Sequence, residues 1–228
     1  MAEHKRISRE LLNDADLPSA LANRILRACS VHDLPPRSFL QHVGDEPGGM
    51  WCLVEGALSV EFAFGMREPQ MSYLLLPPVW VGEGGVITGT QRMVGLSTTR
   101  RSQLLHLPVH QFVSIARDEP LIWRWLAKEQ NLNVARAMGM VDALMVRNSE
   151  ARVAAVLRQL GGRLGRHSDA PFVLDITQAR LALIANTSRT VLSPILKALE
   201  SAGAIELGFS TITVVDPEAL HRLSEPAA

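Results

Sequence analysis

The chain has 228 residues, of which 47% are hydrophobic, and its formal net charge is zero. This length allows one large domain or two modest ones, and the composition supports buried cores. The charge balance gives no overall electrostatic argument for binding nucleic acid, so a site of that kind must come from a local pattern.

Cysteine usage and hydropathy exclude several classes of protein. Cys29 and Cys52 are the only cysteines, which excludes a disulfide framework and a four-cysteine iron–sulfur cluster supplied by this chain alone. No run of 18 apolar residues occurs, and residues 1–12 carry several charges. The sequence therefore predicts neither a membrane span nor a signal peptide, and we expect a cytoplasmic protein without a membrane partner.

The sequence pattern changes along the first half of the chain. Residues 1–30 predict helices, with Pro18 starting the second of them. Residues 39–108 alternate short apolar, β-branched runs with glycine and proline, which is typical of an all-β barrel or a sandwich-like roll. Turns are expected at Gly44, Gly56 and Gly65. Inward-facing side chains are expected at Trp51, Leu53, Leu58 and Val60.

A glycine-rich segment, residues 82–92, interrupts these strands. It contains an acid, Glu83, and a base, Arg92, nine positions apart. Backbone N–H groups of such a loop can surround an anion, Arg92 can bind a phosphate, and Glu83 can accept from a sugar hydroxyl. The simpler alternative is a glycine-rich hairpin with a surface ion pair.

The four histidines near the strands, His32, His42, His106 and His110, do not predict a metal site. His106 and His110 are separated by Pro108, so they do not share a helix face. No paired-histidine or carboxylate-rich spacing occurs, and we interpret these histidines as surface or core residues with no metal.

A long helix is predicted after Pro120, preceded by a short helix over residues 109–117. Apolar residues recur along it at a spacing of three to four, which could form a seam against an identical helix; packing on its own domain is the alternative. Asn148 is placed to cap a following helix over residues 149–163. We therefore expect three regions: a β-roll domain with N-terminal helices at 1–118, a long dimerisation helix at 119–147 and a third domain at 148–228.

Residues 175–203 predict two short helices joined by a tight turn. Thr177 and Ser188 are candidate caps, and Asn186 suits a left-handed turn position. The start of the second helix presents Arg189, Thr190 and Ser193, whereas its apolar residues fall on one face: Val191, Leu192, Ile195, Leu196 and Leu199. This layout is that of a helix-turn-helix, although a helical hairpin inside a larger core has a similar pattern.

Three further features accompany the helix pair. Residues 204–215 predict a β-hairpin, which after such a helix would be a wing, and a short helix is expected over 217–223. Residues 152–197 hold seven basic residues against two acidic ones, a modest phosphate-contacting surface or a solvated helix face. Pro194 predicts a local kink, because it lacks an N–H group and crowds the Thr190 carbonyl.

This order of elements resembles the Crp/Fnr family of bacterial transcription regulators over nearly the whole chain. VGDEPGGMWCLVEGALSV is similar to the family's GD…Y-x-I-x-x-G-x-V stretch, GEGGVITGTQR to its phosphate-binding cassette, and NTSRTVLSPILKALESAG to its recognition helix. The resemblance implies that Glu83 binds a ribose and Arg92 a phosphate.

Several positions depart from the family pattern. Gly84 replaces an aliphatic residue, and Met93 replaces a small or hydroxylated one. Ala137 and Met138 stand where cyclic-AMP-responsive members place hydroxyls against adenine. Thr190 and Pro194 stand where many members have glutamate and a second arginine. The candidate effector site is therefore Gly82, Glu83, Gly84, Arg92, Met93, Ala137 and Met138.

We therefore expect an α+β protein with an N-terminal antiparallel β-roll (jelly-roll-like), a long dimerisation helix and a C-terminal winged helix-turn-helix. The resemblance implies a homodimeric transcription regulator, not an enzyme, that binds a palindromic operator in double-stranded DNA, with RNA polymerase as a further candidate partner. The candidate DNA contacts are Thr177, Gln178, Thr187, Ser188, Arg189, Thr190 and Ser193. No cofactor is certain, and cAMP or cGMP is the candidate effector.

Two alternatives stay open at this stage. One is an effector-independent regulator of the same fold with a degenerate nucleotide pocket. The other is an enzyme using the β-roll as a cupin-like metal barrel, for which the sequence offers no plausible ligand set.

Overall fold

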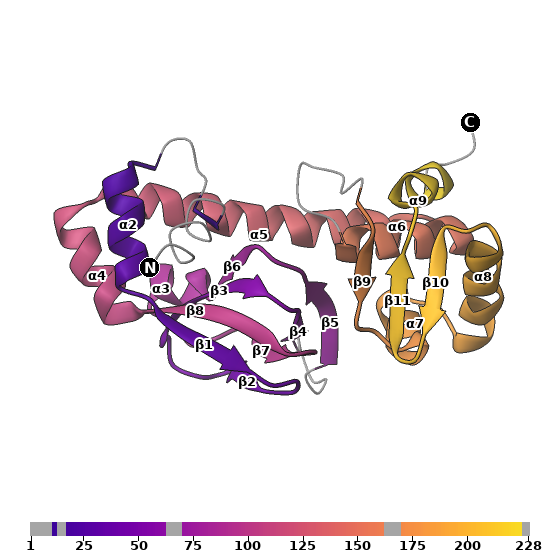
Figure 1. Ribbon diagram of the computed structural model, residues 1–228, viewed down its shortest axis with the longest axis horizontal. Coiled ribbons are helices and arrows are strands. Elements are labelled where there is room, and N and C mark those ends of the chain that lie inside the picture. The colour runs from indigo at the N-terminus through magenta and orange to yellow at the C-terminus, as the bar shows by residue number, and fades with distance from the viewer. Residues whose placement is uncertain (1–10, 13–16, 63–69, 162–169, 225–228) are drawn as a thin grey trace. The chain divides into compact units, whose positions relative to one another are not determined.

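The computed structural model describes residues 11–12, 17–62, 70–161 and 170–224 (Figure 1). The chain divides into two compact units, Met1–Met71 with Leu75–Asn133, and Ser72–Leu74 with Val134–Ala228. The division falls inside the long helix, and the domain limits expected from the sequence stay a prediction. The expected helix before Pro18 and the turn at Gly65 lie largely or wholly outside the described residues.

The first unit is built on antiparallel strands that form two four-stranded sheets, ordered β1-β8-β3-β6 and β2-β7-β4-β5. The strands are β1 (Ser30–Leu34), β2 (Phe39–Gln41), β3 (Gly49–Glu55), β4 (Leu58–Phe62), β5 (Gln70–Leu75), β6 (Val79–Val81), β7 (Gly95–Thr98) and β8 (Ser102–Pro108). Gly44 and Gly56 have φ values of 91° and 105°, which glycine adopts without steric cost. The predicted β-roll and these two turns are confirmed.

Helices cover one face of the first sheet. They are α2 (Ser19–Arg27), α4 (Val109–Asp118) and the first turns of α5 (Leu121–Met145). One hydrophobic cluster joins them to the sheet, and its members include Ile25, Met50, Cys52, Trp80, Leu107, Phe112 and Trp125. The rings of Trp80 and Trp125 meet edge to face, with centroids 5.2 Å apart. This packing fixes the start of α5 against the strand that leads into the glycine-rich segment.

The inward-facing residues expected from alternation are correct only in part. Leu53 and Leu58 are fully buried, whereas Trp51 and Val60 are half-buried. Met50 and Cys52 are buried on the other face of β3, under the helices, so both faces of this strand carry core residues. A strand buried on both faces shows no clear alternation in its sequence, which explains the error.

The second unit contains a helical core and a three-stranded antiparallel sheet. Its elements after α5 are α6 (Ser149–Gly161), β9 (Phe172–Leu174), α7 (Gln178–Ile184), α8 (Arg189–Ser201), β10 (Ile205–Gly208), β11 (Thr211–Val214) and α9 (Pro217–Ser224). The sheet order is β10-β11-β9. Asn148 caps α6 as expected, its side-chain oxygen accepting from the N–H groups of Glu150 and Ala151.

The long helix α5 carries an exposed apolar stripe in the second unit. Val134, Met138, Val141 and Met145 are 47%, 62%, 51% and 75% exposed. They follow one another at intervals of four, three and four residues, the spacing of a coiled-coil seam. Within the described residues, no helix combines the length and apolar character needed to span a bilayer.

Candidate functional site

The turn between α7 and α8 has the local structure that its sequence predicts. The Thr177 hydroxyl oxygen accepts from the N–H of Arg180 at the start of α7, and the Ser188 hydroxyl oxygen accepts from that of Val191 at the start of α8, each at 3.2 Å. Asn186 has φ of 48°, in the left-handed region. Both caps satisfy N–H groups that helix starts leave unpaired, so the angle between the helices is fixed by local chemistry.

Helix α8 has one buried and one exposed side. Leu192, Ile195, Leu196 and Leu199 are at most 7% exposed, which confirms four members of the predicted apolar face. Val191 is the exception and is 43% exposed. It immediately follows Arg189 and Thr190, so it lies near the polar start of the helix instead of in the core.

The polar residues at the start of α8 are available for contacts. Arg189 and Thr190 are exposed and Ser193 is half-buried. Within the part of the chain that the structure describes, the Arg189 guanidinium has no hydrogen-bond or ion-pair partner. Its donors can therefore meet an external acceptor without breaking an internal bond.

Pro194 lies inside α8, which continues from Arg189 to Ser201. Proline has no N–H group to donate to the Thr190 carbonyl four positions earlier. The side of the helix that holds Pro194 is exposed, so water can reach the backbone there. The structure shows an unbroken helix, and the local kink expected from the sequence stays a prediction.

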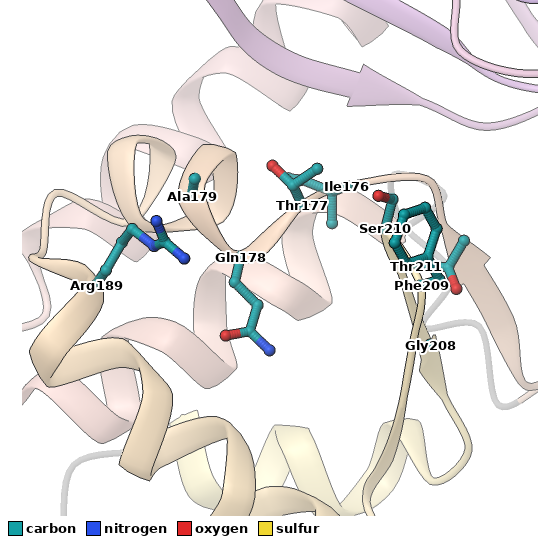
Figure 2. Close-up of a pocket in the computed structure, with 9 residues that line it drawn as sticks. All are labelled: Ile176, Thr177, Gln178, Ala179, Arg189, Gly208, Phe209, Ser210 and Thr211. Atoms are coloured by element: carbon teal, nitrogen blue, oxygen red, sulfur yellow. The ribbon is translucent and has the colours of Figure 1, made fainter.

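A groove separates the start of the helix pair from the turn of the β-hairpin (Figure 2). It has a volume of about 440 Å³ and is lined by Ile176, Thr177, Gln178, Ala179, Arg189 and the turn Gly208–Thr211. Figure 2 shows Arg189 and Gln178 toward one side of this groove and Phe209 and Ser210 on the other. Three predicted DNA contacts, Thr177, Gln178 and Arg189, are thus brought together.

The two basic residues of α6 do not add to this surface. Arg152 donates to the backbone carbonyls of Ala185 and Val146, both at 3.0 Å, and thereby ties the helix-turn-helix to the start of α6. Arg158 is hydrogen-bonded to the His221 ring at 2.9 Å. These two guanidinium groups are held by contacts within the unit, whereas Arg163 and Arg166 lie outside the described residues. The phosphate-contacting surface over residues 152–197 stays a prediction.

The glycine-rich segment of the first unit forms a short helix instead of a simple loop or hairpin. Helix α3 (Glu83–Thr88) begins after Gly82, whose φ is 92°, and ends before Gly89, whose φ is 67°. A Cβ atom on Gly82 or Gly85 would lie 3.0 or 3.1 Å from the Arg92 guanidinium. These glycines therefore allow the Arg92 side chain to pass close to the backbone, which is a tertiary requirement that the sequence does not display.

Arg92 and Glu83 do not form the exposed ion pair that the alternative interpretation required. Arg92 is 5% exposed and Glu83 is 7% exposed. The Arg92 guanidinium donates to the backbone carbonyls of Gly82 and Gly49, while its Nε has no hydrogen-bond partner. Burial lowers the pKa of Arg92, and the nearby Glu83 and Asp45 carboxylates act against this shift. An unpartnered buried donor is the kind of group that an anionic ligand would satisfy.

Asn133 of α5 was not predicted as part of this site. Its side-chain amide donates to a Glu83 carboxylate oxygen at 2.8 Å and to the Trp80 carbonyl at 2.9 Å. Asparagine at one helical position gives no sequence signal for a partner 50 residues away. The contact appears only once β6 and α5 pack together.

The remaining predicted effector residues are mostly exposed. Gly84 is exposed, and a Cβ atom there would only touch Gln130 at 3.9 Å, so the missing side chain leaves room. Met93 is 67% exposed, and Met138 is 62% exposed on α5 beside exposed Ala137. The role of these four residues in binding stays a prediction.

Aromatic rings gather on the first sheet around Trp51. The Trp51 ring stacks on His106 at 4.2 Å and meets His32 edge to face at 5.2 Å. Burial lowers the pKa of His106, and His32 and Arg92 add to the effect. Among the described residues, no three histidine, cysteine or acidic side chains are grouped so as to hold a metal ion.

These features define a class of protein. A capped helix pair with an exposed arginine at the start of its second helix, followed directly by a β-hairpin, is a winged helix-turn-helix DNA-binding domain. It is joined through α5 to a β-roll that contains a buried arginine and glutamate.

Comparisons with known proteins agree with this class. Residues 151–223 match the model of the Crp-like helix-turn-helix domain. The chain is 21% identical over 192 residues to the cAMP-activated global transcriptional regulator CRP of Haemophilus influenzae, covering 83% of this chain and 85% of that protein.

Two solved structures share the fold. The c-di-GMP-responsive global regulator CLP of Xanthomonas campestris has a TM-score of 0.64 at 18% identity, over 87% of this chain and 99% of that one. A Crp/Fnr-family transcriptional regulator of Thermus thermophilus has a TM-score of 0.63 at 21% identity, over 86% and 99%. Residues 151–223 therefore carry a Crp-like helix-turn-helix domain, and the chain shares the fold of these transcription regulators.

Proposed function

We propose that the chain acts as a homodimer that places one α8 helix in each of two successive major grooves of a palindromic operator. The observation that carries this proposal is the exposed, unpartnered Arg189 guanidinium at the capped start of α8. A recognition helix reads base edges with its first residues, and arginine forms two hydrogen bonds with guanine. Half-sites would then be separated by about one helical turn, ~34 Å.

The other exposed groups divide between base and phosphate contacts. Thr190 directly follows Arg189, and the half-buried Ser193 lies about one turn further along α8; both would contact bases or phosphate. Thr177 and Gln178 line the groove and would contact phosphate. Thr187 and Ser188 precede the helix. The Thr187 N–H already donates to the Ala182 carbonyl at 2.9 Å, so the further candidates are the Thr187 hydroxyl and the Ser188 backbone N–H. Val191 adds an exposed apolar side chain that suits a thymine methyl group.

The apolar stripe of α5 supports the homodimer. Four apolar side chains between 47% and 75% exposed would stay in water in a monomer. Pairing with the same helix of a second copy would bury them in one seam. RNA polymerase is a further partner that we propose for regulation at a promoter.

The β-roll is proposed to sense a small anionic effector, with a cyclic nucleotide as the first candidate. Arg92 would bind a phosphate through its unpartnered Nε, Glu83 would accept from a ribose hydroxyl, and Gly82, Gly84 and Met93 would line the same pocket. The names of two similar proteins mention cAMP and c-di-GMP, so both belong among the ligands to test, together with cGMP. Base recognition by Ala137 and Met138 would be apolar.

A specific observation favours a second candidate, a regulator that needs no effector. Arg92 is already held by two backbone carbonyls and Glu83 by Asn133, so both charged groups are ordered without a ligand. Calorimetric titration with cAMP, cGMP and c-di-GMP separates the two candidates. Binding that disappears in Arg92→Ala supports the sensor, whereas absence of heat with all three supports the effector-independent regulator.

The regulator function itself is tested by selecting bound duplexes from a random DNA pool. We expect the selected sequences to share two inverted half-sites. Recovery of no common sequence would contradict the proposal.

A further inference from the structure

Phe209 stands at the tip of the β10–β11 hairpin, where its side chain contributes nothing to the core. It is 99% exposed, whereas the hairpin residues Ile205, Ile212 and Val214 are at most 1% exposed. The strands pair up to Gly208 and Thr211, so Phe209 and Ser210 form a two-residue turn. Such turns favour glycine, asparagine and aspartate, and phenylalanine offers no advantage to the turn itself.

The turn forms one wall of the groove whose other wall holds Gln178 and Arg189 (Figure 2). The groove is therefore continuous with the start of the recognition helix. The hydroxyl groups of Thr177, Ser210 and Thr211 and the Gln178 amide line it as well. These are neutral donors of the kind that bind phosphate oxygens.

We propose that this groove receives one strand of the DNA backbone and that Phe209 contacts the minor-groove edge beyond it. The inference rests on the proposed function, in which Arg189 lies in the major groove. A surface that crosses one backbone strand from the major groove reaches the adjacent minor groove. Aromatic and aliphatic side chains of DNA-binding proteins pack there against sugars or between base steps.

The charge of the wing makes this contact distinguishable from an ordinary phosphate contact. Residues 207–211 contain no lysine or arginine, and Glu206 just before them is acidic. Contacts from the turn therefore release no counterions, and their loss should leave the salt dependence of binding unchanged. Loss of the Arg189 charge should reduce that dependence.

The neighbouring glycine limits how the turn can change. A Cβ atom on Gly208 would lie 2.3 Å from the Thr211 hydroxyl oxygen. Any side chain at 208 would have to displace that hydroxyl from its place in the groove. Phe209 itself can be replaced without such a conflict, because its side chain is almost fully exposed.

The test measures binding of the full chain to the operator obtained by selection. The operator is prepared as two duplexes of different length. One duplex extends beyond the half-site into the flanking minor groove, and the other ends before it. We expect Phe209→Ala to weaken binding to the long duplex about tenfold and to the short duplex less than about twofold. The slope of log affinity against log salt should not change. Phe209→Leu should retain most of the affinity, and Val215→Ala, 38% exposed outside the groove, is the matched control.

Equal effects of Phe209→Ala on both duplexes, or no effect on either, would overturn the inference. An unchanged DNA affinity with lost transcription in a purified polymerase assay would show that Phe209 contacts a protein instead. Failure of the unsubstituted chain to prefer its operator, or no loss in Arg189→Ala, would instead contradict the proposed function. The two failures are therefore separable.

Discussion

The side-chain amide of Asn133 donates a hydrogen bond to the Glu83 carboxylate at 2.8 Å and thereby links the long helix α5 to the start of the glycine-rich cassette. Both groups lie within the first unit, and Glu83 is 7% exposed. A hydrogen bond to a buried charge is worth more than one between neutral groups. We infer that Asn133 holds Glu83 in the orientation that a ligand hydroxyl would meet.

Replacement of Asn133 by leucine should destabilise the fold. The substitution removes donors to Glu83 and to the Trp80 carbonyl, so the free energy of unfolding should fall by about 1.5–3 kcal/mol. Urea unfolding followed by tryptophan fluorescence measures it. Asn131→Leu is the matched control, since Asn131 is exposed on the same helix and should change stability by less than about 0.5 kcal/mol. Equal effects of the two substitutions would argue against the link.

Local chemistry explains why much of the helix-turn-helix could be predicted from its sequence. The caps at Thr177 and Ser188 and the left-handed Asn186 depend on residues within three positions of each other. Contacts between distant segments were not predictable. Asn133 is 50 residues from Glu83, and Arg92 is 43 residues from Gly49, one of the two residues whose carbonyls accept its hydrogen bonds. Nothing in the sequence of either partner marks the other.

Residues that violate a pattern were the other source of error. Val191 fits the apolar spacing of α8 but is 43% exposed, because it stands in the first turn, before the helix enters the core. Trp51 fits an alternating strand but packs against the rings of His32 and His106. Helix α3 was not predicted because three of the four residues from 82 to 85 are glycines, and glycine disfavours a helix in isolation.

The stripe on α5 predicts how the proposed homodimer can be disrupted. Val141→Asp places a charge in the middle of the apolar seam, and burial of an unpaired carboxylate opposes association. The dissociation constant of the dimer should rise at least about tenfold, measured by sedimentation equilibrium. Leu183→Asp, at another apolar position that is 62% exposed but lies on α7, is the control. A wild-type monomer, or equal weakening by both substitutions, would contradict the seam.

Replacement of Pro194 by alanine should raise the free energy of unfolding. Pro194→Ala restores an N–H group that can donate to the Thr190 carbonyl and removes the clash of the ring with that carbonyl. We expect the free energy of unfolding to rise by about 1–3 kcal/mol in urea titration, since the position is exposed. A loss of stability would instead show that the geometry imposed by proline is required for α8 to pack.

His106 of β8 should make the stability of the fold depend on pH. The folded-state pKa of His106 lies below its ordinary value, because burial and the nearby His32, Arg92 and His110 disfavour its charged form, while a hydrogen bond to the Gly48 backbone acts in the opposite direction. Below pH ~6.5 the unfolded chain takes up a proton that the folded chain resists, so stability falls as pH is lowered through this range.

Replacement of His106 by glutamine tests this dependence. Urea unfolding between about pH 5 and 8 should show a smaller loss of stability at low pH in His106→Gln than in the unsubstituted chain. His42→Gln, at an exposed histidine, should keep the original profile. Identical profiles for His106→Gln and the unsubstituted chain would assign the pH dependence to other groups.

The most direct test of DNA reading by α8 is the binding of Arg189 variants to the selected operator and to a scrambled duplex. Arg189→Ala should weaken operator binding by ~1–3 kcal/mol and relax the preference at one base position. Arg189→Lys should restore the salt dependence but not that preference, because lysine cannot form the paired hydrogen bonds. Arg222→Ala, an exposed arginine on α9, is the control. Unchanged operator affinity in Arg189→Ala, or equal losses on both duplexes, would contradict base reading by α8.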